Sequence, residues 1–140
     1  MSLPQPADLT TLVLRTDFAD DAAWQAVRGA IEEADEKRSA TFVSDPRFDG
    51  ASVQQLLDAE AAAVEDDKVC EVFVADATTM TDETHPLLAV DLFDEPGRTF
   101  RVPVRWFPEM SANLSIANAD FADYADAAGA TGTFQGFDAV

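Results

Sequence analysis

Cysteine and histidine are almost absent from this chain, and their scarcity excludes several kinds of site. Cys70 is the single cysteine, so no disulfide can form within the chain and no cysteine-based zinc site is available. It stands in the apolar run 69–74, which is typical of a packed thiol. His85 is the single histidine. Without a second histidine or a nucleophile motif, a catalytic triad is not supported.

Long hydrophobic runs are also missing. No apolar stretch approaches the ~20 residues that a helix needs to span a bilayer. The first residues, 1–6, have neither the basic start nor the apolar segment of a secretion signal. We therefore expect a cytoplasmic protein with no membrane partner.

Basic side chains are few, because 9 Lys and Arg stand against 27 Asp and Glu, for a net charge of -18. Such a surface repels the phosphates of nucleic acids, so a nucleic-acid partner is not expected. The chain is nevertheless 47% hydrophobic and contains ten Phe, which separates it from disordered acidic proteins. The charge therefore belongs to a folded surface, and it favours cations or a basic protein partner.

The apolar pattern predicts one α/β domain over residues 1–140. Its element order is β-α-β-α-β-β-β-α, a single mixed sheet of about five strands with helices packed on it. Strands are expected at 11–16, 40–44, 69–75, 87–93 and 99–106. Helices are expected at 20–36 and 53–66, and from residue 118 or 120 to 129. The third strand is nearly continuous in apolar residues, which is typical of a central strand.

Local signals predict how these elements begin and end. Ser52 is a candidate N-cap for the second helix. The turn at 94–97 predicts a hairpin with a loop of four or five residues between the last two strands. Pro103 cannot donate to a sheet, so the fifth strand is expected at an edge or with a bulge. The segment 77–85 is expected as a loop or short helical turn, and 107–117 as a loop or short strand.

The two ends of the chain are expected outside the main elements. Residues 1–9 are predicted to form an N-terminal arm, and residues 130–140 a tail. Two interpretations of the tail stay open. Either Phe134 and Phe137 hold it to the body, or it is mobile.

Three aspartates follow the first three predicted strands. Asp17, Asp45 and Asp76 would share one edge of the sheet if those strands are parallel, and open α/β sheets bind ligands at that edge. Clustered carboxylates are suitable ligands for Mg²⁺. The alternative is that each aspartate caps a helix or starts a turn, which is a common role after a strand.

Arg101 and Arg105 are paired bases on the polar face of the predicted fifth strand. They either pair with acids of a neighbouring element or mark a groove for an anionic group. The sequence contains no glycine-rich phosphate-binding motif. No specific catalytic or cofactor motif is therefore present.

Four segments carry a resemblance to a known family: 11–18 (TLVLRTDF), 73–80 (FVADATTM), 98–103 (RTFRVP) and 111–118 (SANLSIAN). They are similar to small acidic proteins of actinomycete-type bacteria that are grouped as a domain of unknown function. The resemblance covers nearly the whole chain and implies a bacterial, single-domain, intracellular protein, but no catalytic residue. Candidate binding residues are sought at its motif positions: Arg15, Asp17, Asp76, Thr78, Thr79, Arg101 and Asn113.

Two functional hypotheses follow. The first is a non-catalytic protein-binding module of the inhibitor or immunity type, which uses no cofactor and recognises a basic partner. The net charge of -18 supports it, because solubility of a small domain needs a magnitude of only about 2–8. The alternative is a Mg²⁺-dependent enzyme that acts on a phosphate compound through Asp17, Asp45 and Asp76.

Overall fold

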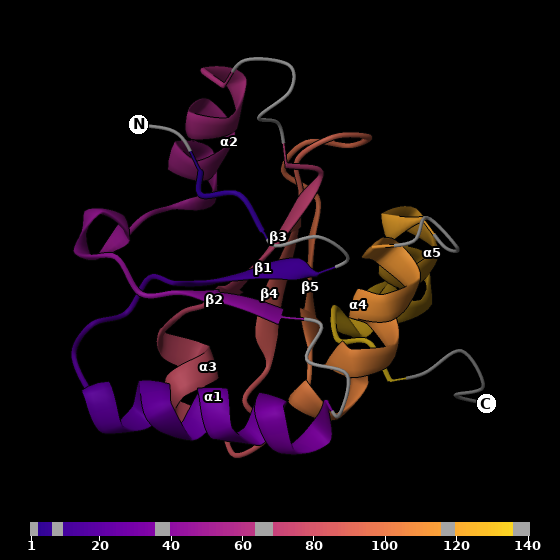
Figure 1. Ribbon diagram of the computed structural model, residues 1–140. Coiled ribbons are helices and arrows are strands. Elements are labelled where there is room, and N and C mark those ends of the chain that lie inside the picture. The colour runs from indigo at the N-terminus through magenta and orange to yellow at the C-terminus, as the bar shows by residue number, and fades with distance from the viewer. Residues whose placement is uncertain (1–2, 7–9, 36–39, 64–68, 116–119, 136–140) are drawn as a thin grey trace.

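A five-stranded mixed sheet forms the centre of the protein, seen in a computed structural model that describes residues 3–6, 10–35, 40–63, 69–115 and 120–135 (Figure 1). The strand order is β2-β1-β3-β4-β5. The strands are β1 (Thr11–Arg15), β2 (Ala40–Val43), β3 (Glu71–Ala75), β4 (Leu87–Asp91) and β5 (Thr99–Val102). The first three are parallel to one another, and β4 and β5 form an antiparallel hairpin. The predicted α/β fold and the central place of the third strand are confirmed.

Helices cover both faces of this sheet. They are α1 (Asp21–Ala34), α2 (Val53–Ala61), α3 (Ala77–Thr81), α4 (Phe107–Ser115) and α5 (Phe121–Ala128). The described residues also form three short 3₁₀ turns: η1 (Pro46–Phe48), η3 (Val104–Trp106) and η4 (Gly129–Thr131). In Figure 1, α1 and α2 lie on opposite sides of the sheet.

Alternation along the strands divides the core into two layers. Val13 points to one face and packs in a cluster with α1, α4 and α5, which includes Trp24 and Ile31. Leu12 and Leu14 point to the other face and pack in a cluster with η1 and α2. Successive side chains of a strand face opposite ways, so the apolar run of β1 supplies both layers.

The predicted helix starts are confirmed by their caps. The Asp20 carboxylate accepts the N–H groups of Ala22 and Ala23 at the start of α1. Ser52 forms a capping box with Gln55 at the start of α2. The predicted helix ends at residues 36 and 66 lie outside the described residues.

The hairpin differs from the prediction because its loop spans residues 92–98 and not four or five residues. The cause is Asp91, whose carboxylate accepts the N–H groups of Phe93, Asp94 and Glu95. These hydrogen bonds turn the chain before it reaches the expected turn. The strand β5 also ends early, at Val102, because Pro103 directs the chain into η3.

The prediction of a loop or short strand at 107–117 was wrong, because residues 107–115 form α4. Phe107 and Met110 are fully buried in the core cluster beneath this helix. Pro108 lies in the first turn, where a missing N–H costs no hydrogen bond. The segment 77–85 contains the short helix α3, as one of its two interpretations predicted.

The two edges of the sheet differ. The outer side of β5 is covered, because Arg101 N–H donates to Gly132 O and Phe134 N–H donates to Arg101 O. Phe134 is buried, so it holds the described part of the tail to the body, while Phe137 lies outside the described residues. No strand of the described chain lies beyond β2. Within the same residues, no helix is long and apolar enough to cross a membrane.

Candidate functional site

The carboxyl ends of β1 and β3 lie next to each other, as the parallel arrangement requires. Thr16 N–H, just past β1, donates to Ala75 O at the end of β3 over 3.0 Å. Most of the predicted binding residues follow these strand ends or lie opposite them. The predicted binding residues at this edge are therefore described first.

Arg15 is the last residue of β1 and its side chain is only 4% exposed. The guanidinium donates to Asp17 O over 2.8 Å, to Ser44 Oγ over 3.3 Å and to Asp21 Oδ1 over 2.8 Å. Its Cζ also lies 4.3 Å from the centroid of the Phe18 ring. Arg15 thus ties the ends of β1 and β2 to the start of α1, and its hydrogen-bonding groups are committed inside the fold.

The three strand-end aspartates do not form one cluster. The Asp17 carboxylate accepts the N–H of Ala19, and the Asp45 carboxylate accepts the N–H and Nε of Arg47. Across the described part of the chain, no group of three or more His, Cys, Asp or Glu side chains could hold a metal ion. Mg²⁺ binding therefore stays a prediction without a ligand set on this edge.

Asp76 and Arg101 form a bidentate ion pair at this edge. Two parallel hydrogen bonds, each 2.9 Å, join Arg101 Nη1 and Nη2 to the two Asp76 oxygens. Burial acts to raise the pKa of the Asp76 carboxyl, but hydrogen bonds from Arg101 and Thr79 outweigh it and hold that pKa below its ordinary value. The carboxylate is ionised at neutral pH and its charge is compensated, which does not suit a general acid.

The predicted threonines differ in their placement. Thr79 is fully buried and its hydroxyl donates to Pro86 O over 2.7 Å, while its N–H donates to Asp76. Thr78 is exposed on α3. The structure thus brings Asp76, Thr79 and Arg101 together in one network, with Thr78 beside it on the surface.

Asn113 belongs to a different contact. Its Nδ2 donates to the hydroxyl of Tyr124 over 2.9 Å and joins α4 to α5. Arg105, expected to behave like Arg101, instead lies over Trp106, with its Cζ 5.1 Å from the ring centroid. Arg101 therefore follows the ion-pair interpretation. The binding role of all these residues stays a prediction.

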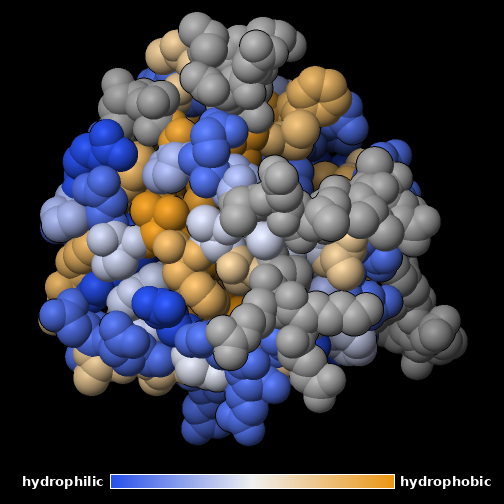
Figure 2. Space-filling view, in the orientation of Figure 1, coloured by the Kyte–Doolittle hydropathy of each residue, from blue (hydrophilic) through white to orange (hydrophobic). Residues whose placement is uncertain are grey.

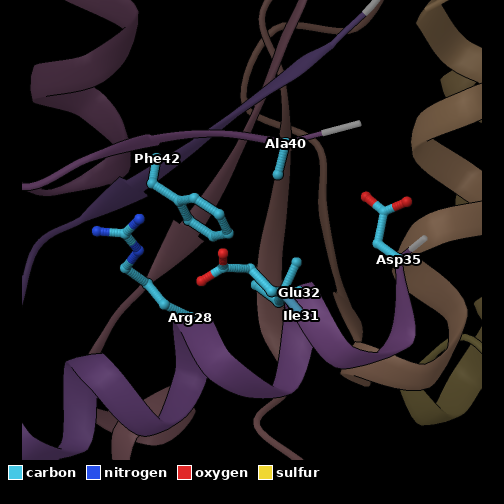
Figure 3. A pocket seen from close by; sticks show the side chains of 6 residues that line it. All are labelled: Arg28, Ile31, Glu32, Asp35, Ala40 and Phe42. Carbon is cyan, nitrogen blue, oxygen red and sulfur yellow. The ribbon is translucent and has the colours of Figure 1, made fainter. Parts of the chain in front are cut away.

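A small cavity of about 180 Å³ lies between α1 and the edge strand β2 (Figure 3). Its lining residues are Arg28, Ile31, Glu32, Asp35, Ala40 and Phe42. This cavity was not predicted from the sequence. The available signal was the spacing of Arg28 and Glu32, four residues apart on a predicted helix and so on one face.

Exposed carboxylates are spread over most elements of the surface. The exposed acids among the described residues are Asp20, Asp21, Glu32, Glu33, Asp49, Asp58, Asp82, Glu83, Asp94, Glu95, Glu109, Asp120, Asp123 and Asp126. Of the arginines in the same residues, only Arg47 and Arg105 are exposed. The acidic excess of the sequence is therefore displayed to solvent.

Comparison with known families gives one match. The family model described as "Domain of unknown function (DUF6924)" matches residues 10–137. None of the curated proteins matches the chain.

Proposed function

Since the chain belongs to this family of unknown function, we propose that it is a non-catalytic protein-binding module that recognises a basic partner. The specific form proposed is an inhibitor or immunity-type protein. The proposal includes a cytoplasmic location in an actinomycete-type bacterium, which the resemblance of the four sequence segments supports.

The observation that carries the proposal is the imbalance of exposed charge. The net charge is -18, and most exposed charged side chains in the described residues are carboxylates. Arg15 pairs with Asp21, Arg101 pairs with Asp76, and Arg98 pairs with Glu95 and Asp126. The arginines thus leave much of the acidic surface uncompensated.

Such a surface has a physical consequence for association. Charge of one sign creates a field that steers an oppositely charged protein and raises its rate of encounter. The same field disfavours acidic partners. A basic protein is thus the class of macromolecule that this surface attracts most strongly.

The test is capture of binding proteins by the immobilised chain from bacterial lysate at low and high salt. We expect proteins of high isoelectric point that are released at high salt, because a Debye length of about 3 Å at ~1 M salt screens exposed charges. A folded acidic protein of unrelated sequence serves as the control for nonspecific ion exchange. Each captured protein is then purified and titrated against the chain by calorimetry.

Two results would contradict the proposal. One is that no protein binds the chain more strongly than it binds the acidic control. The other is that the captured proteins are not basic or resist release by salt. A defined stoichiometry with one basic protein would support it.

A further inference from the structure

The cavity between α1 and β2 has one apolar side, formed by Ile31, Ala40 and Phe42, and one side of charged residues. Ile31 is buried at its base, and Ala40 and the ring of Phe42 come from the neighbouring edge strand. Figure 3 shows these side chains facing one another across the space between helix and strand. This apolar side can contact an unbranched aliphatic chain.

Two carboxylates line the same cavity. Glu32 and Asp35 are both on or next to the last turn of α1, and Figure 3 shows both side chains on the cavity side of the helix. Glu32 is exposed, so an incoming ligand can reach its carboxylate from solvent, whereas Asp35 is buried and only 4% exposed. The cavity thus combines an apolar side with one carboxylate that a ligand can reach.

Arg28 does not neutralise Glu32, although the two are one helical turn apart. Its Cζ lies 4.7 Å from the centroid of the Phe42 ring, and its Nε is buried with no hydrogen-bond partner. No ion pair between Arg28 and Glu32 occurs in the described structure. Because Arg28 already occupies one face of Phe42, the remaining space favours a slender ammonium side chain over a second planar guanidinium.

The position of the cavity also favours an extended ligand. β2 is the last strand on its side in the described sheet, whereas β5 on the opposite edge is covered by the tail. Extended peptides commonly bind at an open sheet edge, with pockets that receive alternate side chains. Figure 2 shows this face, where apolar surface appears over the β2 region above the hydrophilic row along α1.

We propose that this cavity receives a lysine side chain from an extended segment of a basic protein. The aliphatic stem of the lysine lies along Ile31, Ala40 and Phe42, and its ammonium group lies beside the exposed carboxylate of Glu32. This inference rests on the proposed function for the identity of the partner. It adds the site and the side chain by which that partner is recognised.

The direct test is NMR titration of the folded protein with the capped peptide Thr-Val-Lys-Val-Thr. Two matched peptides replace the lysine by norleucine, which keeps the stem without the charge, and by glutamate. We expect the lysine peptide to shift the amide signals of Ile31, Glu32, Ala40 and Phe42. The norleucine peptide is expected to bind about threefold to tenfold more weakly, and the glutamate peptide to cause no shift.

A pair of variants isolates the role of the cavity. Glu32→Gln removes one charge from the lining, and Glu33→Gln removes one charge from the next helix position, which does not line the cavity. Both side chains are exposed, so both variants are expected to fold. We expect Glu32→Gln to weaken lysine-peptide binding by about threefold to tenfold and Glu33→Gln by less than about twofold.

The inference is overturned if the lysine peptide leaves the cavity signals unchanged, or if both variants weaken binding equally, which would indicate diffuse attraction. Its failure is distinguishable from failure of the proposed function. A captured basic partner that binds Glu32→Gln as tightly as the natural chain would refute the cavity alone. Peptide binding at the cavity without any basic protein partner would refute the proposed function alone.

Discussion

At the scale of single residues, two neighbouring acids, Glu71 and Asp91, lie in different surroundings. Glu71 and Asp91 face each other across the β3–β4 pair. The Asp91 carboxylate accepts three backbone N–H groups of the hairpin loop. Burial, and then the charge of Asp91, raise the pKa of Glu71 from 4.5 to about 7. The fold therefore favours the proton on Glu71, while the Asp91 side chain anchors the hairpin loop through its hydrogen bonds.

The raised pKa of Glu71 predicts how stability depends on pH. Because the folded state binds this proton more tightly than the unfolded state does, the associated stability is present below pH 4.5 and is lost as pH rises to about 7. The loss amounts to at most about 3 kcal/mol. Glu71→Gln is expected to remove this decline and to exceed the natural chain in stability above pH 7. Urea unfolding over a series of pH values measures it.

Glu33→Gln serves as the control for this experiment, because Glu33 is exposed and the substitution likewise replaces one Glu by Gln. Its unfolding free energy should follow the pH profile of the natural chain. An unchanged profile in Glu71→Gln would show that Glu71 is not the group responsible.

At the scale of elements, the strands with strong apolar runs and the capped helices were predictable from sequence. β1, β3 and the starts of α1 and α2 needed only alternation, continuous apolar residues and the caps Asp20 and Ser52. These signals are local. They predicted the α/β class, whereas the parallel arrangement of the first three strands was a condition of the carboxylate hypothesis that the strand pairing meets.

Helix α4 was missed because its buried stripe contains a polar residue. Phe107, Met110 and Leu114 have helical spacing, but Ser111 occupies the position between them and is fully buried. Its hydroxyl lies 2.8 Å from that of Thr11 in β1. A partner a hundred residues away in the chain makes this serine compatible with the core, and no local pattern could show that.

The contact between Asp76 and Arg101 could not be predicted from the sequence for a similar reason. Both residues were candidates, but their pairing depends on the register of two antiparallel strand pairs. Leu88 in β4 stands opposite Val74 on one side and Arg101 on the other, which brings the long arginine side chain to the end of β3. The cavity at β2 likewise required the packing of α1 against the edge strand.

The tail segment gives a prediction at this scale. Phe134 is 1% exposed, and its ring lies 5.7 Å from Trp106 and 5.2 Å from Tyr124. Phe134→Ala is expected to lower the free energy of unfolding by about 3–5 kcal/mol, because it leaves a cavity and loosens the cover on β5. Phe93→Ala is the matched control, since Phe93 is 70% exposed, and it should change stability by less than about 0.5 kcal/mol. Equal effects in denaturant unfolding would mean that the tail does not hold the edge.

At the scale of the whole molecule, the charge of -18 attracts cations whether or not a built site exists. Cation binding by a diffuse field and by a chelating site differ in how strongly each depends on any single residue. In the field, many exposed carboxylates contribute weakly and equally. In a site, loss of one ligand abolishes binding.

Titration of Mg²⁺, Mn²⁺ and Ca²⁺ into the metal-free protein therefore separates the protein-binding proposal from the enzyme alternative. We expect weak binding at many sites, because Asp17, Asp45 and Asp76 accept separate hydrogen bonds and Asp76 would have to release Arg101 to bind a metal.

The double variant Asp17→Asn/Asp76→Asn should bind these metal ions almost as the natural chain does. Glu33→Gln/Asp58→Asn, which removes two exposed charges from α1 and α2, should do the same. Circular dichroism must show that each variant is folded, since Asp76→Asn breaks the pair with Arg101. A single strong site that disappears only in the first variant would favour the Mg²⁺-dependent enzyme, because only a chelating site distinguishes those two aspartates from the exposed acids of the surface.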